Sequence, residues 1–284
     1  MLVLLTGCGD SSDPGDSLDA GTPAVGRIDV TESTMLGHPP RENGAVSARF
    51  TTSGLPLWQV EDMREASCRL MRYQVGNCPD CWNGVCVKPD ECRPFPTYVS
   101  VDDLSISGLK IPMGFRYDEY AGYRADRPLP PNLFDAGDSV MVSATGGDMP
   151  AFSASASAVA GLDANIPADQ EGTVLLRDGA DFQLSWQPVA GDHRIRLVLN
   201  SATTGHGLPV EGYIECDVAD TGNLVVPRAL VEAFPFASTS PICVGVDCPP
   251  SFLTRYSRST TGAGQGVELL VESRVEFWLR HVTE

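Results

Sequence analysis

The chain has 284 residues, a formal net charge of −17 and a pI near 4.5. Nucleic acid is excluded as an expected partner, because binding to phosphates needs a basic face. Hydrophobic residues make up 42% of the chain, which is enough for the core of one large domain or two ordinary ones.

The first residues resemble the lipobox of bacterial lipoproteins. A short apolar run at residues 2–7 (LVLLTG) leads directly into Cys8. In that family signal peptidase cleaves before the cysteine, which becomes the lipidated N-terminus. The resemblance implies that residues 1–7 are the remnant of a signal peptide and that Cys8 holds the protein on the membrane. Because the segment before Cys8 is too short for a complete signal peptide, we expect the true start of translation to lie upstream.

The segment after Cys8 predicts a disordered acidic tether over residues 8–44. Residues 9–26 are mostly Gly, Ser, Asp and Pro and offer almost nothing to bury. Gly9, directly after the cysteine, favours the outer membrane by the sorting rule of enteric lipoproteins. No other apolar run approaches the roughly 18–20 residues that a membrane-spanning helix needs, so we expect the lipid to be the membrane attachment.

The rest of the chain predicts an all-β fold: an antiparallel β-sandwich over residues 45–284, with a disulfide-rich insertion and one short helix. Residues 45–51 (AVSARFT) alternate in polarity and predict the first strand. Residues 98–109 predict two short strands around an Asp-Asp corner. Residues 139–144 and 151–158 predict the two arms of a hairpin.

A Cys-rich insert is predicted at about residues 63–94, where five cysteines lie close together: Cys68, Cys78, Cys81, Cys86 and Cys92. Cys78 and Cys81 have the C-x2-C spacing of a zinc ligand pair. A second such pair is missing from the sequence, and no histidine is nearby. Because export places these thiols in an oxidising compartment, disulfides are the preferred interpretation, and we expect neither a metal nor a cofactor.

The three remaining candidates, Cys216, Cys243 and Cys248, suggest how the bridges are distributed. Five cysteines in the first group and three in the second are both odd numbers. If all are oxidised, at least one bridge joins the two groups. Cys243 and Cys248 are near enough in sequence to pair together, so Cys216 is the expected crossing residue. The competing hypothesis leaves Cys216 as a buried free thiol.

Three tyrosines, Tyr117, Tyr120 and Tyr123, lie within seven residues and form a candidate binding site. Such a group of aromatic rings can stack on a sugar. The alternative interpretation is a strand face or a rim.

Residues 181–235 contain the clearest β pattern. Phe182, Leu184 and Trp186 alternate with polar residues and predict a half-buried strand with Phe182 and Trp186 in the core. Further alternating runs at 194–199 and 214–218 predict two more strands. Pro227 stands where a helix over residues 228–234 would begin.

Two resemblances arise in this part of the chain. Residues 184–188 (LSWQP) resemble the early Trp-bearing strand of fibronectin type III domains. Residues 133–152 (LFDAGDSVMVSATGGDMPAF) and 214–227 (IECDVADTGNLVVP) are similar to runs of uncharacterised secreted β-rich lipoproteins of myxobacterial type. This second resemblance implies an envelope-exposed β-rich protein and brings no activity or functional residues with it.

The sequence contains no recognisable catalytic motif among its scattered histidines, serines and glycines. We therefore expect a non-enzymatic cell-envelope lipoprotein, a surface binding or structural module whose partner is a protein or polysaccharide of the envelope. The alternative is a secreted hydrolase or carbohydrate-acting enzyme on a β-sandwich fold. An enzyme should show a cleft where carboxylates, or a histidine and a nucleophile, converge. A binding module should show an exposed aromatic or apolar patch instead.

Overall fold

The computed structural model describes residues 25–52, 59–73, 81, 84–88, 91–95, 97–201, 211–235, 249–261 and 266–282. Within these ranges the chain is nearly all β, and the helix α1 (Arg228–Ala233) is short. The predicted fold class is therefore confirmed. None of the described helices is long and apolar enough to cross a membrane.

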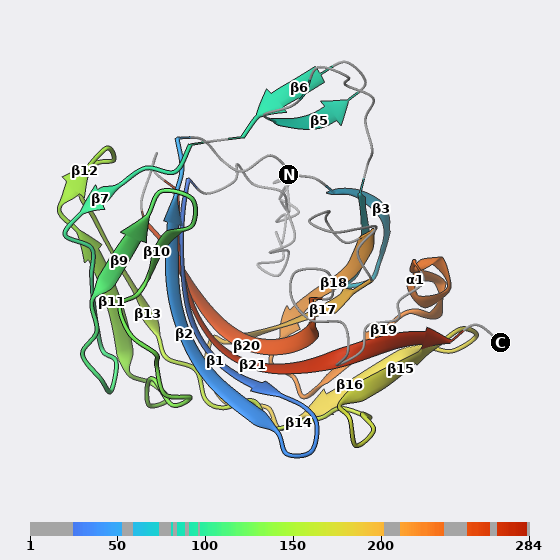
Figure 1. Cartoon of the computed structure of the whole chain (residues 1–284). Coiled ribbons are helices and arrows are strands. Elements are labelled where there is room, and N and C mark those ends of the chain that lie inside the picture. The colour runs from blue at the N-terminus through green and yellow to red at the C-terminus, as the bar shows by residue number, and fades with distance from the viewer. Residues whose placement is uncertain are drawn as a thin grey trace, which may run out of the picture.

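One large, strongly curved sheet organises the molecule (Figure 1). Its strands in spatial order are β3 (Gln59–Glu65), β4 (Cys68–Tyr73), β18 (Gly212–Ala219), β17 (Arg194–Asn200), β20 (Ser251–Thr260), β21 (Val267–Val282), β1 (Gly26–Met35), β2 (Arg41–Phe50), β10 (Gly122–Ala125) and β9 (Phe115–Asp118). An eleventh strand, β15 (Thr173–Arg177), also pairs with β21. The β1–β21 and β15–β21 pairs are parallel, so this sheet is mixed, not purely antiparallel as predicted.

Two three-stranded sheets cover this large sheet and make it a sandwich. One consists of β13 (Phe152–Ser157), β11 (Ser139–Ala144) and β8 (Ser105–Ser107), and the other of β14 (Ala164–Asn165), β16 (Phe182–Trp186) and β19 (Asn223–Val226). Figure 1 shows both on the convex side of the curve, one at each arm. Two small ribbons complete the fold, β12 (Gly146–Gly147) with β7 (Val101–Asp102), and β5 (Gly84–Lys88) with β6 (Glu91–Pro94).

The sandwich contains two hydrophobic cores, and β21 contributes to both. Val267, Leu269 and Val271 pack in the core under β11 and β13. Farther along, Val275, Phe277 and Leu279 pack in the core under β16. All six positions are odd and therefore point to one face of the strand. Both cores thus lie on the convex face of the same sheet.

The predicted tether is wrong over residues 26–44, because these residues form β1 and the start of β2. Ile28 and Val30 are fully buried in the core. Their neighbours Arg27 and Asp29 bond each other on the opposite face of the strand. A strand with one polar face resembles a polar linker in the sequence when its partner strands are unknown. For this reason the domain was predicted to start at residue 45, which is too late in the chain.

The predicted insert at residues 63–94 also starts too early. Residues 63–65 end β3 and residues 68–73 form β4, and both strands belong to the large sheet. Among the described residues of this range, the β5–β6 ribbon stands apart from the body (Figure 1). β4 follows the usual period of two, because Cys68 and Leu70 are buried and Arg69 between them is partly exposed. The dense cysteine spacing obscured this strand pattern in the sequence.

The elements predicted for residues 139–158 and 181–235 are confirmed. β11 and β13 pair as a hairpin in antiparallel register. β16 and β17 span the predicted ranges, and α1 begins directly after Pro227. Phe182 is 8% exposed and Trp186 is 6% exposed, so both lie in the core as expected.

Candidate functional site

A cleft of about 720 Å³ opens on the convex side, where the two covering sheets leave the middle of β1 and β21 bare. Thr34 of β1 and Ser273 of β21 belong to its floor. Pro131 and Asn132 form one side, and the crossing segment from residue 161 to residue 163 forms the other. The cleft follows from the fold, because the chain passes here from one hydrophobic core to the other.

Three carboxylates line the cleft, but one of them has a structural role. The side chain of Glu32 accepts hydrogen bonds from the backbone N–H groups of Leu133, at 2.5 Å, and Phe134, at 3.2 Å. It therefore fixes the loop that forms one wall. Glu42 and Asp163 are exposed at the rim. Among the described residues, no group of three His, Cys, Asp or Glu side chains is placed to hold a metal ion.

The other wall of the cleft is held by a buried ion pair between Arg255 and Asp220. The guanidinium donates to Asp220 at 2.8 Å and to the carbonyl oxygens of Ala160, at 3.2 Å, and Gly161, at 2.7 Å. A further bond reaches the carbonyl of Gln187 at 2.7 Å. Because Arg255 is fully buried, these bonds satisfy a charge that would otherwise be very unfavourable in the core. They fix the segment that crosses between the two cores.

Sequence reasoning missed Arg255, although the sequence contains a signal for it. In β20 the positions 251, 253 and 255 point to one face, and Leu253 on that face is buried. An arginine whose side chain points to the core face of a strand needs a buried hydrogen-bond acceptor. That acceptor, Asp220, comes from the turn between β18 and β19, a place that no local pattern indicates.

The concave face of the large sheet carries a network of ion pairs across neighbouring strands. Arg196 of β17 lies between Glu215, at 3.4 Å, and Asp217, at 3.7 Å, both on β18. The hydroxyl of Tyr256 donates to Asp217 at 2.5 Å. Burial alone would lower the pKa of Arg196, but Glu215, Tyr256 and Asp217 raise it above its ordinary value. The network therefore keeps its charges paired in the folded chain.

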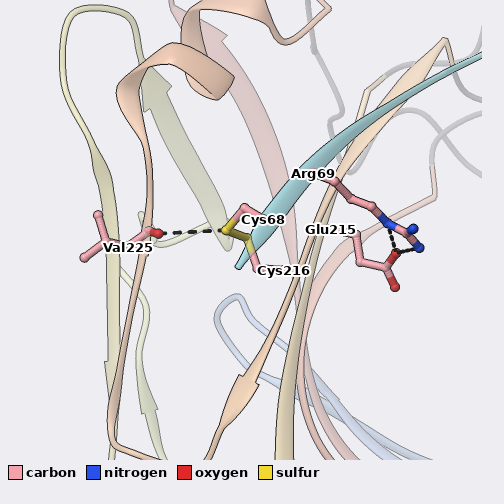
Figure 2. The surroundings of a disulfide bond; sticks show 5 residues. All are labelled: Cys68, Arg69, Glu215, Cys216 and Val225. Carbon is pink, nitrogen blue, oxygen red and sulfur yellow. Dashed lines mark hydrogen bonds and ion pairs between the residues drawn. A yellow bond between two sulfur atoms is a disulfide. The ribbon is translucent and has the colours of Figure 1, made fainter. Parts of the chain in front are cut away.

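The predicted bridge between the two cysteine groups is confirmed as Cys68–Cys216. The two residues are direct partners on β4 and β18, with Cα atoms 4.0 Å apart, and both are fully buried. Figure 2 shows the disulfide on the core side of these strands, facing Val225, while Arg69 and Glu215 pair on the opposite side. The bridge thereby joins two neighbouring strands of the large sheet, next to its β3 edge.

A second bridge joins Cys81, which precedes β5, to Cys92 of β6. Cys86 is also disulfide-bonded. Since the thiols of Cys81 and Cys92 bond each other, Cys81 is not a zinc ligand, and the disulfide interpretation holds for it. The predicted sites at Cys8, Cys78, Cys243 and Cys248 lie outside the described residues.

The three tyrosines do not share one surface. Tyr120 is 82% exposed and Tyr117 is 38% exposed, whereas Tyr123 is only 6% exposed. The hydroxyl of Tyr123 donates to the carbonyl of Val101 at 2.6 Å and accepts from its N–H at 2.7 Å. Tyr123 is therefore a core residue, and including it in a binding site was wrong. Its ring packs against Tyr117, with centroids 4.9 Å apart, and Tyr120 is the most exposed ring of the three.

One histidine is buried beside a carboxylate. His281 is 4% exposed, and its Nε2 lies 2.7 Å from Asp178 Oδ1. Its Nδ1 is buried and has no hydrogen-bond partner in the described part of the chain. The ring also lies near Phe234, with centroids 6.1 Å apart. The contact between His281 and Asp178 joins the end of β21 to the residue that follows β15.

No family model matches this chain, and neither do any curated proteins or solved structures.

Proposed function

We propose that this protein is a lipid-anchored component of the bacterial cell envelope, and that its β domain is a non-enzymatic binding or structural module. The observation that supports this most is the disulfide content. Cys68–Cys216 closes a loop across the large sheet and Cys81–Cys92 closes the protruding ribbon. Such bridges form and persist in oxidising compartments outside the cytoplasm, which is where a lipoprotein is exported.

The anchor in this proposal is the lipobox-like run that ends at Cys8, with attachment to the outer membrane. A cysteine carrying several acyl chains holds a protein on a membrane without a second signal. The surface that the module offers to a protein or polysaccharide of the envelope includes the cleft beside Asp163, which combines hydroxyl and carboxylate groups over an extended floor.

The anchor is tested by labelling. The gene is expressed in a bacterial host with its upstream codons and with labelled palmitate, and the membrane fraction is compared for wild type, Cys8→Ala and Ser12→Ala. We expect label and membrane association to be lost in Cys8→Ala and kept in Ser12→Ala, which changes a residue of the same segment that bears no thiol. A Cys8→Ala protein that still carries label would contradict the proposal.

A second candidate function, a secreted carbohydrate-acting enzyme, has one observation in its favour. Glu42 and Asp163 line the same cleft, and most glycoside hydrolases use two carboxylates that flank the bond they cleave. Release of reducing sugar from envelope polysaccharide by the purified protein, abolished in Asp163→Asn, would support this function. Equal release by wild type and Asp163→Asn would remove the cleft from consideration.

A further inference from the structure

The strand β21 changes its neighbour partway along one edge, from β1 to β15. β1 pairs with β21 as far as Met35 opposite Glu276, and β15 takes over from Thr173 opposite Trp278. The last bonds on either side are Leu36 N–H to the carbonyl of Glu276, at 2.8 Å, and Trp278 N–H to the carbonyl of Gly172, at 2.9 Å. Figure 1 shows β1 turning away into its hairpin at this point while β21 continues beside β15.

A pocket of about 290 Å³ lies where the partner strand changes, lined among others by Leu36, His38, Arg41, Gln170, Glu171 and Trp278. Its two walls are the β1–β2 hairpin and the turn before β15. A Cβ atom at Gly172 would lie 2.1 Å from the carbonyl oxygen of Leu36, and Gly172 has a φ of +79°. The walls approach each other this closely because that position has no side chain. The pocket is therefore a built feature of the fold.

Trp278 belongs to this pocket with an unused donor. The residue is 8% exposed. Within the described part of the chain its indole N–H has no hydrogen-bond partner, and it is not one of the buried unpaired polar atoms there, so this nitrogen is accessible to solvent. By contrast, the indole of Trp186 donates from Nε1 to Asp220 at 2.6 Å. The donor of Trp278 remains available for an acceptor on a ligand in the pocket.

The other lining groups indicate the chemistry of that ligand. The guanidinium of Arg41 is a donor, the carboxylate of Glu171 is an acceptor, and the amide of Gln170 is both. A hydroxyl group also donates and accepts, so a ligand rich in hydroxyls matches this set. The opposite charges of Arg41 and Glu171 balance, which favours an uncharged ligand. A pocket of this volume lies at the small end of ligand sites and suits one ring.

We propose that this pocket is a binding subsite for a single neutral sugar ring. An aromatic side chain beside balanced donors and acceptors supplies both apolar contact and hydrogen bonds to such a ring. The inference rests on the proposed envelope function only for the source of the sugar, a polysaccharide of the cell surface. It also separates the sugar site from the tyrosines at β9 and β10, where Tyr123 is buried.

The test uses the full chain carrying Cys8→Ala, so that lipidation plays no part. Saturation-transfer difference NMR is recorded with glucose, galactose, N-acetylglucosamine and glucuronate as separate probes. We expect a neutral sugar to bind with a Kd of about 1 mM, typical of one small ring with few contacts. Trp278→Phe, which removes the indole N–H, and Glu171→Ala, at an exposed turn, should each weaken binding by about tenfold, or about 1.4 kcal/mol.

Tyr120→Ala is the matched control, since it removes the most exposed tyrosine far from the pocket in sequence. Binding should be unchanged in this variant. Any one of four results would overturn the proposal: no neutral sugar binds, glucuronate alone binds, binding is unchanged in Glu171→Ala, or binding falls in Tyr120→Ala. If Trp278→Phe does not fold, Glu171→Ala still decides. None of these results bears on palmitate labelling of Cys8. The proposal of a lipid anchor and the proposal of a sugar site can therefore be refuted independently.

Discussion

Replacement of Asp220 by alanine tests how the two cores are joined. The carboxylate of Asp220 accepts from Arg255 Nε at 2.8 Å, from Trp186 Nε1 at 2.6 Å and from the backbone N–H of Val189 at 3.3 Å. Side-chain exposure is 0% for Arg255 and 2% for Asp220. Asp220→Ala therefore removes one acceptor group from three donors at once, two of them on the buried residues Arg255 and Trp186.

The expected cost follows from these contacts. Breaking a buried ion pair by removing one partner costs about 3–5 kcal/mol, because the other charge stays unpaired. An unsatisfied buried N–H, here that of Trp186, costs about 1–3 kcal/mol. Both losses arise from one carboxylate and do not simply add. We expect Asp220→Ala to lower the free energy of unfolding by about 5 kcal/mol, a large part of the roughly 5–15 kcal/mol of an ordinary domain.

Urea unfolding followed by circular dichroism measures this loss. Glu232→Ala is the control, because Glu232 pairs with Arg228 on the exposed face of α1 at 2.6 Å, and such a pair contributes about 0.5 kcal/mol or less. Asp220→Asn keeps an acceptor for Trp186 and isolates the loss of charge, and it serves as the measured variant if Asp220→Ala does not fold. A loss in Asp220→Ala as small as that in Glu232→Ala would refute the reasoning.

Three further predictions concern the disulfide, the core and pH. The double variant Cys68→Ala/Cys216→Ala should lose about 2–5 kcal/mol of stability in urea, since the bridge closes a loop of 148 residues; an unchanged midpoint would contradict this. Trp186→Ala should cost about 3–5 kcal/mol, and a loss below about 1 kcal/mol would show that its burial contributes little. Burial raises the pKa of Glu276 above 4.5, against the opposing effect of Arg274 and Arg41. Folding therefore disfavours the ionised carboxylate, so Glu276→Gln should be more stable than wild type at neutral pH, with the difference vanishing as pH falls below 4.5. A less stable Glu276→Gln at neutral pH would contradict that sign.

Local patterns were sufficient for most strands and for the helix. The alternation around Trp186 predicts both the strand and its buried face, because successive side chains in a strand point to opposite sides. Pro227 marks the start of α1 for a reason that is equally local. Where the pattern failed, at β1, the alternating residues Ile28 and Val30 were present. Their polar neighbours made the segment look like a linker.

The candidate sites depended much less on local pattern. Parity predicted that a bridge joins the two cysteine groups through Cys216, but not that its partner is Cys68. The partner follows from the register of β18 against β4. Tyr123 follows Tyr120 by three residues in the sequence, and the packing of β10 against the core distinguishes their burial. Arg255 finds its acceptor, Asp220, on a different strand connection.

The sequence by itself determined the all-β class and the faces of many strands, and it predicted a bridge between the cysteine groups on the condition that all eight cysteines are oxidised. The tertiary structure alone decided that β1 pairs with β21 in parallel, that both cores share one face of β21, and that Trp278 lies at a break between two strand partners. The reason is physical. Alternation and turn chemistry act over a few residues, whereas strand pairing joins segments hundreds of residues apart and leaves no periodic mark in either one.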